Sequence, residues 1–302
     1  MKKNAAISLI ICPILVLGLA AILIKNTGRP PKTAELGKLR VVASFYPLYF
    51  MSAQIGGDKA EVINILPTGA EPHDYEPTAK DMAKMENSQL IILNGNGLEA
   101  WSDNLKKNIN AGRTNIIEAR AEIRSTNLDP HVWLDPALAQ KMVDKIAQSF
   151  ERTDPLNKSY YETNANALKS RLNDLDNAYK QALSKCAEKN IITSHAAFGY
   201  LAAAYGLKQI PIAGLSPDTE PTPQQLTDLI KFAKTNNIKY IFFESLASPK
   251  LAQTIAAEVG AQTLTLNPLE GLSQEELAQG KNYLSIMQDN LKNLQIALEC
   301  SK

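Results

Sequence analysis

Residues 155–188 read PLNKSYYETNANALKSRLNDLDNAYKQALSKCAE, a stretch without any strand signal. Its apolar residues recur at helical spacing, and Asp154 followed by Pro155 is typical of an N-cap and a first helical residue. A continuous helix here would reach ~50 Å, which is the span of a two-lobed molecule. Two successive helices with a kink are the alternative. The apolar positions are Leu168, Leu172, Leu175, Tyr179 and Ala182.

Short aliphatic and β-branched runs alternate with amphipathic stretches on both sides of this segment. Such alternation indicates βαβ units. We therefore predict an α/β protein of two lobes, each a parallel sheet flanked by helices, joined by one long rigid helix. The expected limits are 39–154 for the first lobe, 155–188 for the helix and 189–302 for the second lobe. The expected strands are Leu39–Ala43, Val62–Leu66, Leu90–Leu93, Asn190–Thr193, Gln209–Ala213, Tyr240–Phe243 and Thr263–Leu266, and the expected helices include Thr78–Asn87, Pro136–Phe150, Thr222–Thr235 and Pro249–Val259.

The composition is that of an ordinary globular protein. The chain has 302 residues, of which 32 are basic and 31 acidic, for a formal net charge of +1. This length suggests two domains. Because no basic block stands out, a nucleic-acid partner has no electrostatic support.

The N-terminus predicts export. Lys2 and Lys3 precede an uncharged apolar run, Ala5–Ile24, of the length that a membrane span needs. We expect residues 1–27 to be a membrane anchor, with a removed signal peptide as the alternative and lipidation of Cys12 as a minor one. A polar linker, residues 28–38, follows, and the body of the protein lies outside the cytoplasm.

The exported part contains two cysteines, Cys186 and Cys300. An oxidising compartment permits them to pair. We expect a disulfide that ties the C-terminal tail to the end of the long helix.

All three histidines of the chain lie in predicted loops next to Pro, Asp or Ser. His73 follows the second expected strand, His195 follows Asn190–Thr193, and His131 precedes a helix. Ligands in parallel sheets gather beyond the carboxyl ends of strands, and Glu270 also follows a strand. Three imidazoles with one carboxylate make a tetrahedral site suited to Zn²⁺.

Neighbouring residues have supporting roles in this prediction. Asp129 and Asp135 are expected to cap helices or to hold the other ring nitrogen of His131. Glu244, at the end of Tyr240–Phe243, is expected to orient a ligand by hydrogen bonding, with a role as a metal ligand as the alternative. The remaining expectations are helix caps at Asp74 and Glu76 and packing roles for Trp101 and Trp133.

Four ordered segments carry a family resemblance: GAEPHDYEP at 69–77, DPHVWLDP at 129–136, TSHAAF at 193–198 and FFES at 242–245. They resemble the signature segments of the metal-specific substrate-binding proteins of ABC importers for zinc and manganese. The resemblance covers Leu39 to Cys300. It implies two α/β lobes with a metal in the cleft between them, and as partners a membrane permease and its ATPase.

The resemblance also implies the metal ligands. His73 and His131 would come from the first lobe, and His195 with a carboxylate from the second. Some relatives carry Asp where this chain has Asn267, so Glu270 is the expected fourth ligand, with Asn267 or water as the alternatives. His195 stands where manganese-type relatives have a carboxylate, which favours Zn²⁺ over Mn²⁺. No histidine occurs between Asp74 and Pro130, so the His-rich loop of some zinc importers is absent.

We therefore expect a monomeric extracytoplasmic zinc-capturing protein and no enzyme. A manganese-binding homologue is the first alternative. A zinc hydrolase with three histidines and an open fourth position is the second, although the His-Glu-x-x-His spacing is missing. A surface-interaction protein is a third interpretation, for which no sequence feature speaks.

Overall fold

The computed structural model describes residues 37–120, 123 and 128–301, and the chain from Lys38 onward forms one compact unit. The expected anchor, the alternative lipid site at Cys12 and nearly all of the linker lie outside the described residues. Within the described residues, no helix is both long and apolar enough to span a bilayer.

The long helix is α6, Lys158–Leu183, and it is continuous. Its 26 residues correspond to ~39 Å, so it is shorter than expected at both ends. Asp154 does not cap it directly, because a 3-10 turn at Pro155–Asn157 comes first. The Asp154 carboxylate instead accepts hydrogen bonds from the Asn157 amide and the Tyr161 hydroxyl. The predicted apolar face is buried at Leu168, Leu172, Leu175 and Tyr179.

The first sheet is parallel and has the strand order β2-β1-β3-β4. Sequence patterning predicted β1 and β3 correctly and placed β2 two residues late. It missed β4, an edge strand in which Ile116 and Ile117 are the only apolar residues. The strands are β1 Leu39–Ala43, β2 Ala60–Asn64, β3 Leu90–Leu93 and β4 Asn115–Glu118.

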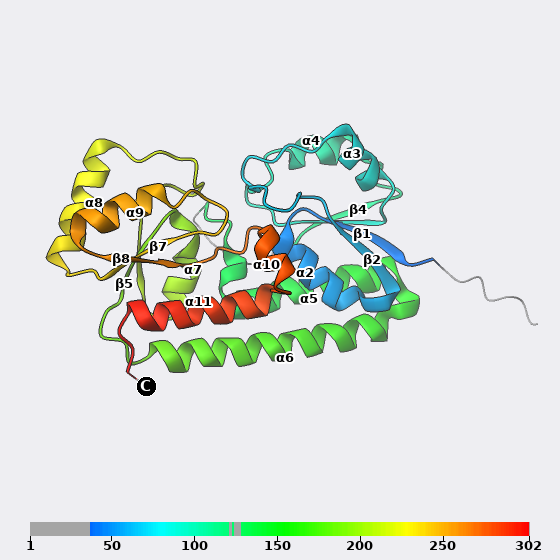
Figure 1. Cartoon of the computed structure of the whole chain (residues 1–302). Helices are drawn as coiled ribbons and strands as arrows, with labels where there is room; N and C mark the ends of the chain where they lie inside the picture. The colour runs from blue at the N-terminus through cyan, green and yellow to red at the C-terminus, as the bar shows by residue number, and fades with distance from the viewer. Residues whose placement is uncertain (1–36, 121–122, 124–127, 302) are drawn as a thin grey trace, which may run out of the picture. The chain divides into compact units, whose positions relative to one another are not determined.

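The second sheet is also parallel and repeats this arrangement in the order β6-β5-β7-β8. The two sheets lie over opposite ends of α6 (Figure 1). The predicted class, two α/β lobes joined by a long helix, is thus confirmed, whereas the domain limits at 154 and 189 stay predictions. The strands are β5 Asn190–Thr193, β6 Lys208–Pro211, β7 Tyr240–Phe243 and β8 Gln262–Thr265.

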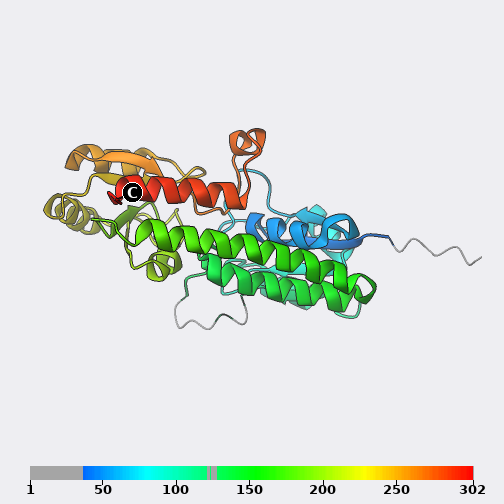
Figure 2. The same ribbon diagram turned by 90° about the horizontal axis from the view of Figure 1, so that it is seen from below.

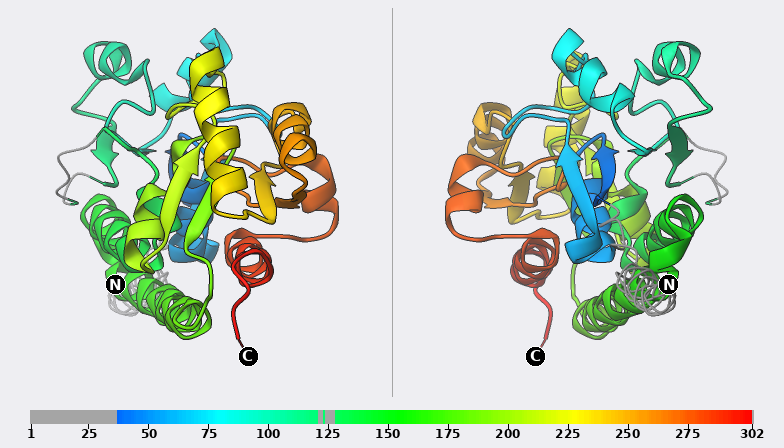
Figure 3. Two further views of the ribbon diagram at one scale, coloured as in Figure 1. Left: turned by 90° about the vertical axis from the view of Figure 1, so that its left-hand side faces the viewer. Right: turned by 90° about the vertical axis from the view of Figure 1, so that its right-hand side faces the viewer.

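Helices cover both sheets. Seen from below, α5 and α11 lie beside α6, which also contacts α2 (Figure 2). One apolar core runs from the first lobe along α6 into the second. A separate core lies between β7, α8 and α9. The two end views show α8 and α9 in front when the second lobe faces the viewer and behind when the first lobe does (Figure 3). The helices are α2 Tyr46–Gly56, α3 Ala79–Glu86, α4 Ser102–Asn108, α5 Pro136–Thr153, α7 Gly199–Ala204, α8 Pro223–Thr235, α9 Lys250–Val259, α10 Gln274–Ala278 and α11 Tyr283–Ala297.

The predictions of helix caps and of a disulfide have different outcomes. The expected caps at Asp74 and Glu76 are wrong, because Thr78 caps α3 and forms a reciprocal capping box with Asp81. The expected disulfide is confirmed: Cys186 and Cys300 are bonded across a separation of 114 residues. This bond ties the chain after α11 to the segment that follows α6.

Candidate metal centre

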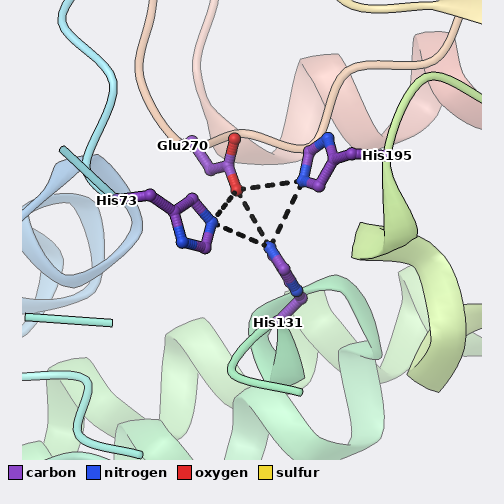
Figure 4. Close-up of side chains that lie close together, drawn as sticks. All are labelled: His73, His131, His195 and Glu270. Atoms are coloured by element: carbon purple, nitrogen blue, oxygen red, sulfur yellow. Dashed lines mark hydrogen bonds and ion pairs between the residues drawn. The ribbon is translucent and has the colours of Figure 1, made fainter. Parts of the chain in front are cut away.

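Three histidines and one glutamate converge between the two lobes (Figure 4). His73 lies in the loop between β2 and α3, and His131 directly precedes the 3-10 turn Val132–Leu134 that leads into α5. His195 follows β5, and Glu270 follows β8. Each lobe thus supplies two side chains from segments near the carboxyl ends of its strands, where parallel sheets gather their ligands.

The donor atoms are close enough to share one ion. The Nε2 atom of His131 lies 3.3 Å from that of His73 and 3.4 Å from that of His195. Glu270 Oε1 lies 3.2 Å from His73 Nε2, 3.0 Å from His131 Nε2 and 3.4 Å from His195 Nε2. All four ligand atoms lie within 4.8 Å of one another.

These separations match a tetrahedron around a small cation. A tetrahedral Zn²⁺ with bonds of about 2.0 Å places neighbouring donors about 3.3 Å apart. Five of the six donor–donor distances fall between 3.0 and 3.4 Å. The cluster therefore has the donors and the spacing of a four-coordinate zinc site.

The His131 ring is held by a residue of its own loop. Asp129 Oδ1 accepts a hydrogen bond from the backbone N–H of His131 at 2.9 Å and lies 2.7 Å from its Nδ1. Because the carboxylate accepts from Nδ1–H, Nε2 is the ring atom that faces the centre, where its lone pair would bind a metal ion. Asp129 thus has the expected orienting role, and Asp135 is an N-cap that accepts from Ala137 and Leu138.

The His195 ring is held in the same way by a residue from another strand. Glu244 Oε1 lies 2.7 Å from His195 Nδ1 and accepts from the His195 backbone N–H at 3.2 Å. Glu244 follows β7, which pairs with β5. The expected orienting role of Glu244 is supported by this geometry.

The loop that carries Glu270 is fixed by several buried contacts. Trp133 Nε1 donates to the Pro268 carbonyl at 2.8 Å, and Asn267 Oδ1 accepts from the Leu269 N–H at 2.7 Å. Leu269 has a φ of 61°, a left-handed conformation that is costly for a leucine. The Asn267 amide nitrogen donates to Ser245 and Glu276. The Asn267 side chain is therefore fully hydrogen-bonded within the protein and stabilises the conformation of this loop. Trp133 packs against the His131 ring as well as in the core.

Burial and charge act together on the titratable groups. Burial disfavours a charge on Glu270, but the positive charge on His195 and hydrogen bonds from the three histidines hold the pKa of Glu270 well below its usual range. Burial likewise opposes protonation of His195, yet Glu270 and Glu244 outweigh it and raise the pKa of His195 to about 10. Asp129 and Glu270 raise the pKa of His131 in the same manner.

Sequence reasoning missed Glu71, two residues before His73. Its Oε1 accepts from the His73 backbone N–H at 3.4 Å. Burial and the nearby Glu270 raise the pKa of Glu71 to about 8. Its position in the segment GAEPHDYEP was the available signal.

Sequence reasoning also missed a set of hydrogen bonds that fixes the segment directly before His131. Glu99 is buried and accepts backbone hydrogen bonds from Asn94 and Gly95 in the loop after β3. The Asn94 amide then donates to the Pro130 carbonyl at 3.1 Å. The run Asn94-Gly95-Asn96-Gly97 signals a turn, but nothing local links it to His131.

Two lobes, a long connecting helix and a cluster of side chains between them that could hold a metal ion are the features of a two-lobed metal-binding protein. Comparison with known families agrees. Residues 41–297 match the family described as "Zinc-uptake complex component A periplasmic", and the chain belongs to this family.

Individual relatives support the assignment. The high-affinity zinc uptake system protein ZnuA of Bacillus subtilis is 43% identical over 280 residues, which cover 86% of this chain and 88% of that protein. The zinc-binding lipoprotein AdcA of Streptococcus pneumoniae is 39% identical over 85% of this chain, which spans only 55% of that longer relative. The crystal structure of the Zn(II)-bound ZnuA-like domain of S. pneumoniae AdcA superposes with a TM-score of 0.79 at 41% identity, covering 87% of this chain and 100% of that domain.

Proposed function

We propose that this protein captures Zn²⁺ outside the cytoplasm in the cleft between its lobes and delivers it to an ABC permease and its ATPase. His73, His131, His195 and Glu270 are the proposed ligands. The observation that carries the proposal is the set of five donor distances of 3.0 to 3.4 Å.

The donor chemistry favours zinc over manganese. Three imidazole nitrogens and one carboxylate oxygen suit Zn²⁺, whereas Mn²⁺ prefers sites richer in oxygen. Asn267 is a poor candidate for the fourth ligand because its side chain is committed to Ser245, Glu276 and Leu269. Glu270, which contacts all three histidines, supplies the negative charge.

A binding role is favoured over hydrolysis. A catalytic zinc keeps one position for water or substrate. The four proposed donors, all within 4.8 Å of one another, are enough to fill a four-coordinate shell without water. Membership of a zinc-uptake family agrees that the chain is a binding protein and not an enzyme.

The family description names a periplasmic component of an uptake complex, and a relative is described as a lipoprotein. Both descriptions support a location outside the cytoplasm. We further propose that the protein works as a monomer tethered to the membrane by the apolar run 5–24. Detergent-dependent partition of the native protein, compared with a chain in which this run carries two aspartates, tests the tether.

The test of the metal site uses the fact that the chain has only three histidines. Selective ¹⁵N-histidine labelling gives signals from these residues alone. On titration with Zn²⁺ we expect all three Nε2 resonances to shift at one equivalent, while Nδ1 of His131 and His195 stays protonated. Metal analysis of the same sample is expected to give one zinc per chain.

The matched controls are Mn²⁺ as competitor and Asp103→Asn as a variant, since Asp103 is exposed on α4. Asp103→Asn should bind like the original chain, and Mn²⁺ should not displace Zn²⁺. A histidine whose Nε2 does not respond to zinc would contradict the proposed ligand set.

A further inference from the structure

A cavity of about 390 Å³ borders the metal centre. Glu71 in its wall lies two residues before His73, and Ser194 directly precedes His195. Leu246, also in the wall, packs against the loop of Glu270: a Cβ placed on Gly271 would lie 3.1 Å from Leu246 Cδ1. Two of the four loops that carry the proposed ligands therefore border the cavity, and a third, that of Glu270, lies against its wall residue Leu246.

The four proposed ligands differ in how exposed their side chains are. The His73 side chain is 12% exposed, whereas those of His131 and His195 are 0% exposed and that of Glu270 is 1% exposed. His73 is thus the most exposed of the four proposed ligands. Glu71 of the same loop both lines the cavity and accepts the His73 backbone N–H.

The cavity wall has the charge that suits a cation. Two acidic residues, Asp218 and Glu220, line it, against a single basic residue, Lys250. A cleft with an excess of one sign of charge raises the local concentration of the opposite ion and its rate of association. At ~30 Å³ for each water, the cavity also has room for an ion with its hydration shell.

We propose that Zn²⁺ enters and leaves the metal centre through this cavity, which we call the entry cavity. The hydrated ion collects between the loop 212–221 and the segment 246–252, which includes the start of α9, then passes Glu71 and meets His73 first. It then exchanges its remaining waters for the buried His131, His195 and Glu270. This inference rests on the proposed function and adds the route to it.

Obstruction of the entry cavity tests the route. Ala247 is a half-buried wall residue, and Ala247→Trp would fill part of the cavity without touching a ligand. We expect zinc association and release, measured by stopped-flow with a chelating dye, both to slow about tenfold. The Kd should stay the same, because a barrier on the path slows both directions equally. Leu156→Trp is the matched control, because Leu156 is exposed in the 3-10 turn Pro155–Asn157 and does not line the cavity.

A second variant covers the possibility that Ala247→Trp does not fold. Ser248→Cys is exposed in the wall and can be labelled with a bulky maleimide after folding, with the original chain treated alike to correct for Cys12. Labelling should slow both rates at constant Kd. Unchanged rates in the labelled protein would overturn the proposed route. Absence of zinc binding by the original chain would instead overturn the proposed function.

Discussion

The two lobes repeat one sheet, with the orders β2-β1-β3-β4 and β6-β5-β7-β8, yet they hold their buried histidines differently. In the first lobe the partner of His131 is Asp129, two residues away in the same loop. In the second the partner of His195 is Glu244, 49 residues away after a neighbouring strand. Both carboxylates accept from the backbone N–H and lie 2.7 Å from Nδ1.

The comparison shows that one geometric requirement can be met by local sequence or by sheet pairing. An imidazole that binds a metal through Nε2 needs a fixed Nδ1–H, and a carboxylate provides it. In the first lobe a tight loop brings the carboxylate to the ring. In the second lobe the pairing of β5 with β7 does so.

The largest effect is expected for His131→Ala and His195→Ala. Each removes a fully buried donor and leaves Glu270 with one partner fewer. Zinc affinity should fall by more than the roughly 100-fold typical of an outer residue. Competition titration against a chelator measures this. If the two lobes contribute equally to zinc binding, the two variants should lose similar amounts of zinc affinity. A strong loss of affinity in only one variant would show that the two lobes do not contribute equally.

The orienting carboxylates should have the next largest effect. Asp129→Ala and Glu244→Ala each free a histidine ring to rotate and to change tautomer, and we expect zinc affinity to fall about 10- to 100-fold. Asp129→Asn and Glu244→Gln keep an acceptor for Nδ1–H and should restore part of the loss. An equal recovery of zinc affinity in both lobes would show that Asp129 and Glu244 orient their histidines to the same extent.

Zinc affinity should rise with pH. In the metal-free protein Glu270 and Glu244 raise the pKa of His195 to about 10, so at pH 7 zinc must displace that proton. Each proton released contributes about tenfold in affinity per pH unit, a dependence that persists up to the pKa of the metal-free site. Calorimetry in two buffers of different ionisation enthalpy counts the protons.

Glu270→Gln is the control for this pH dependence. Because Glu270 raises the pKa of both His131 and His195, the variant should release fewer protons on binding zinc. Zinc binding without any proton release at pH 7 by the original chain would contradict the expected protonation.

The smallest effect on zinc affinity is expected from the disulfide. Replacing Cys186 and Cys300 by serine opens a loop of more than one hundred residues and should lower the free energy of unfolding by about 2–4 kcal/mol. Thermal unfolding under oxidising conditions measures this loss. Zinc affinity should stay the same, because the bond joins segments after α6 and α11, away from the ligand loops. A large loss of affinity would link the C-terminal tail to the metal centre.

Several elements were predictable because their signals are local. The strands Leu39–Ala43 and Tyr240–Phe243 consist mostly of aliphatic or aromatic residues, and the structure forms them as predicted. β4 was missed although β5, which was predicted, has the same two adjacent isoleucines, so a pair of apolar residues does not by itself distinguish a strand from a loop. The start of α6 was placed three residues early because Pro155 opens a 3-10 turn rather than the helix.

The features of the candidate site can also be separated into those with a local sequence signal and those without one. The sequence by itself determined which residue types were available: three loop histidines, a glutamate after a strand, and an aspartate beside His131. Tertiary structure alone decided that Glu244 orients His195, that Asn267 shapes a loop, and that Glu71 and Ser194 border one cavity. These relations depend on which strands pair and how the lobes meet, and such long-range contacts leave no mark in the local spacing of residues.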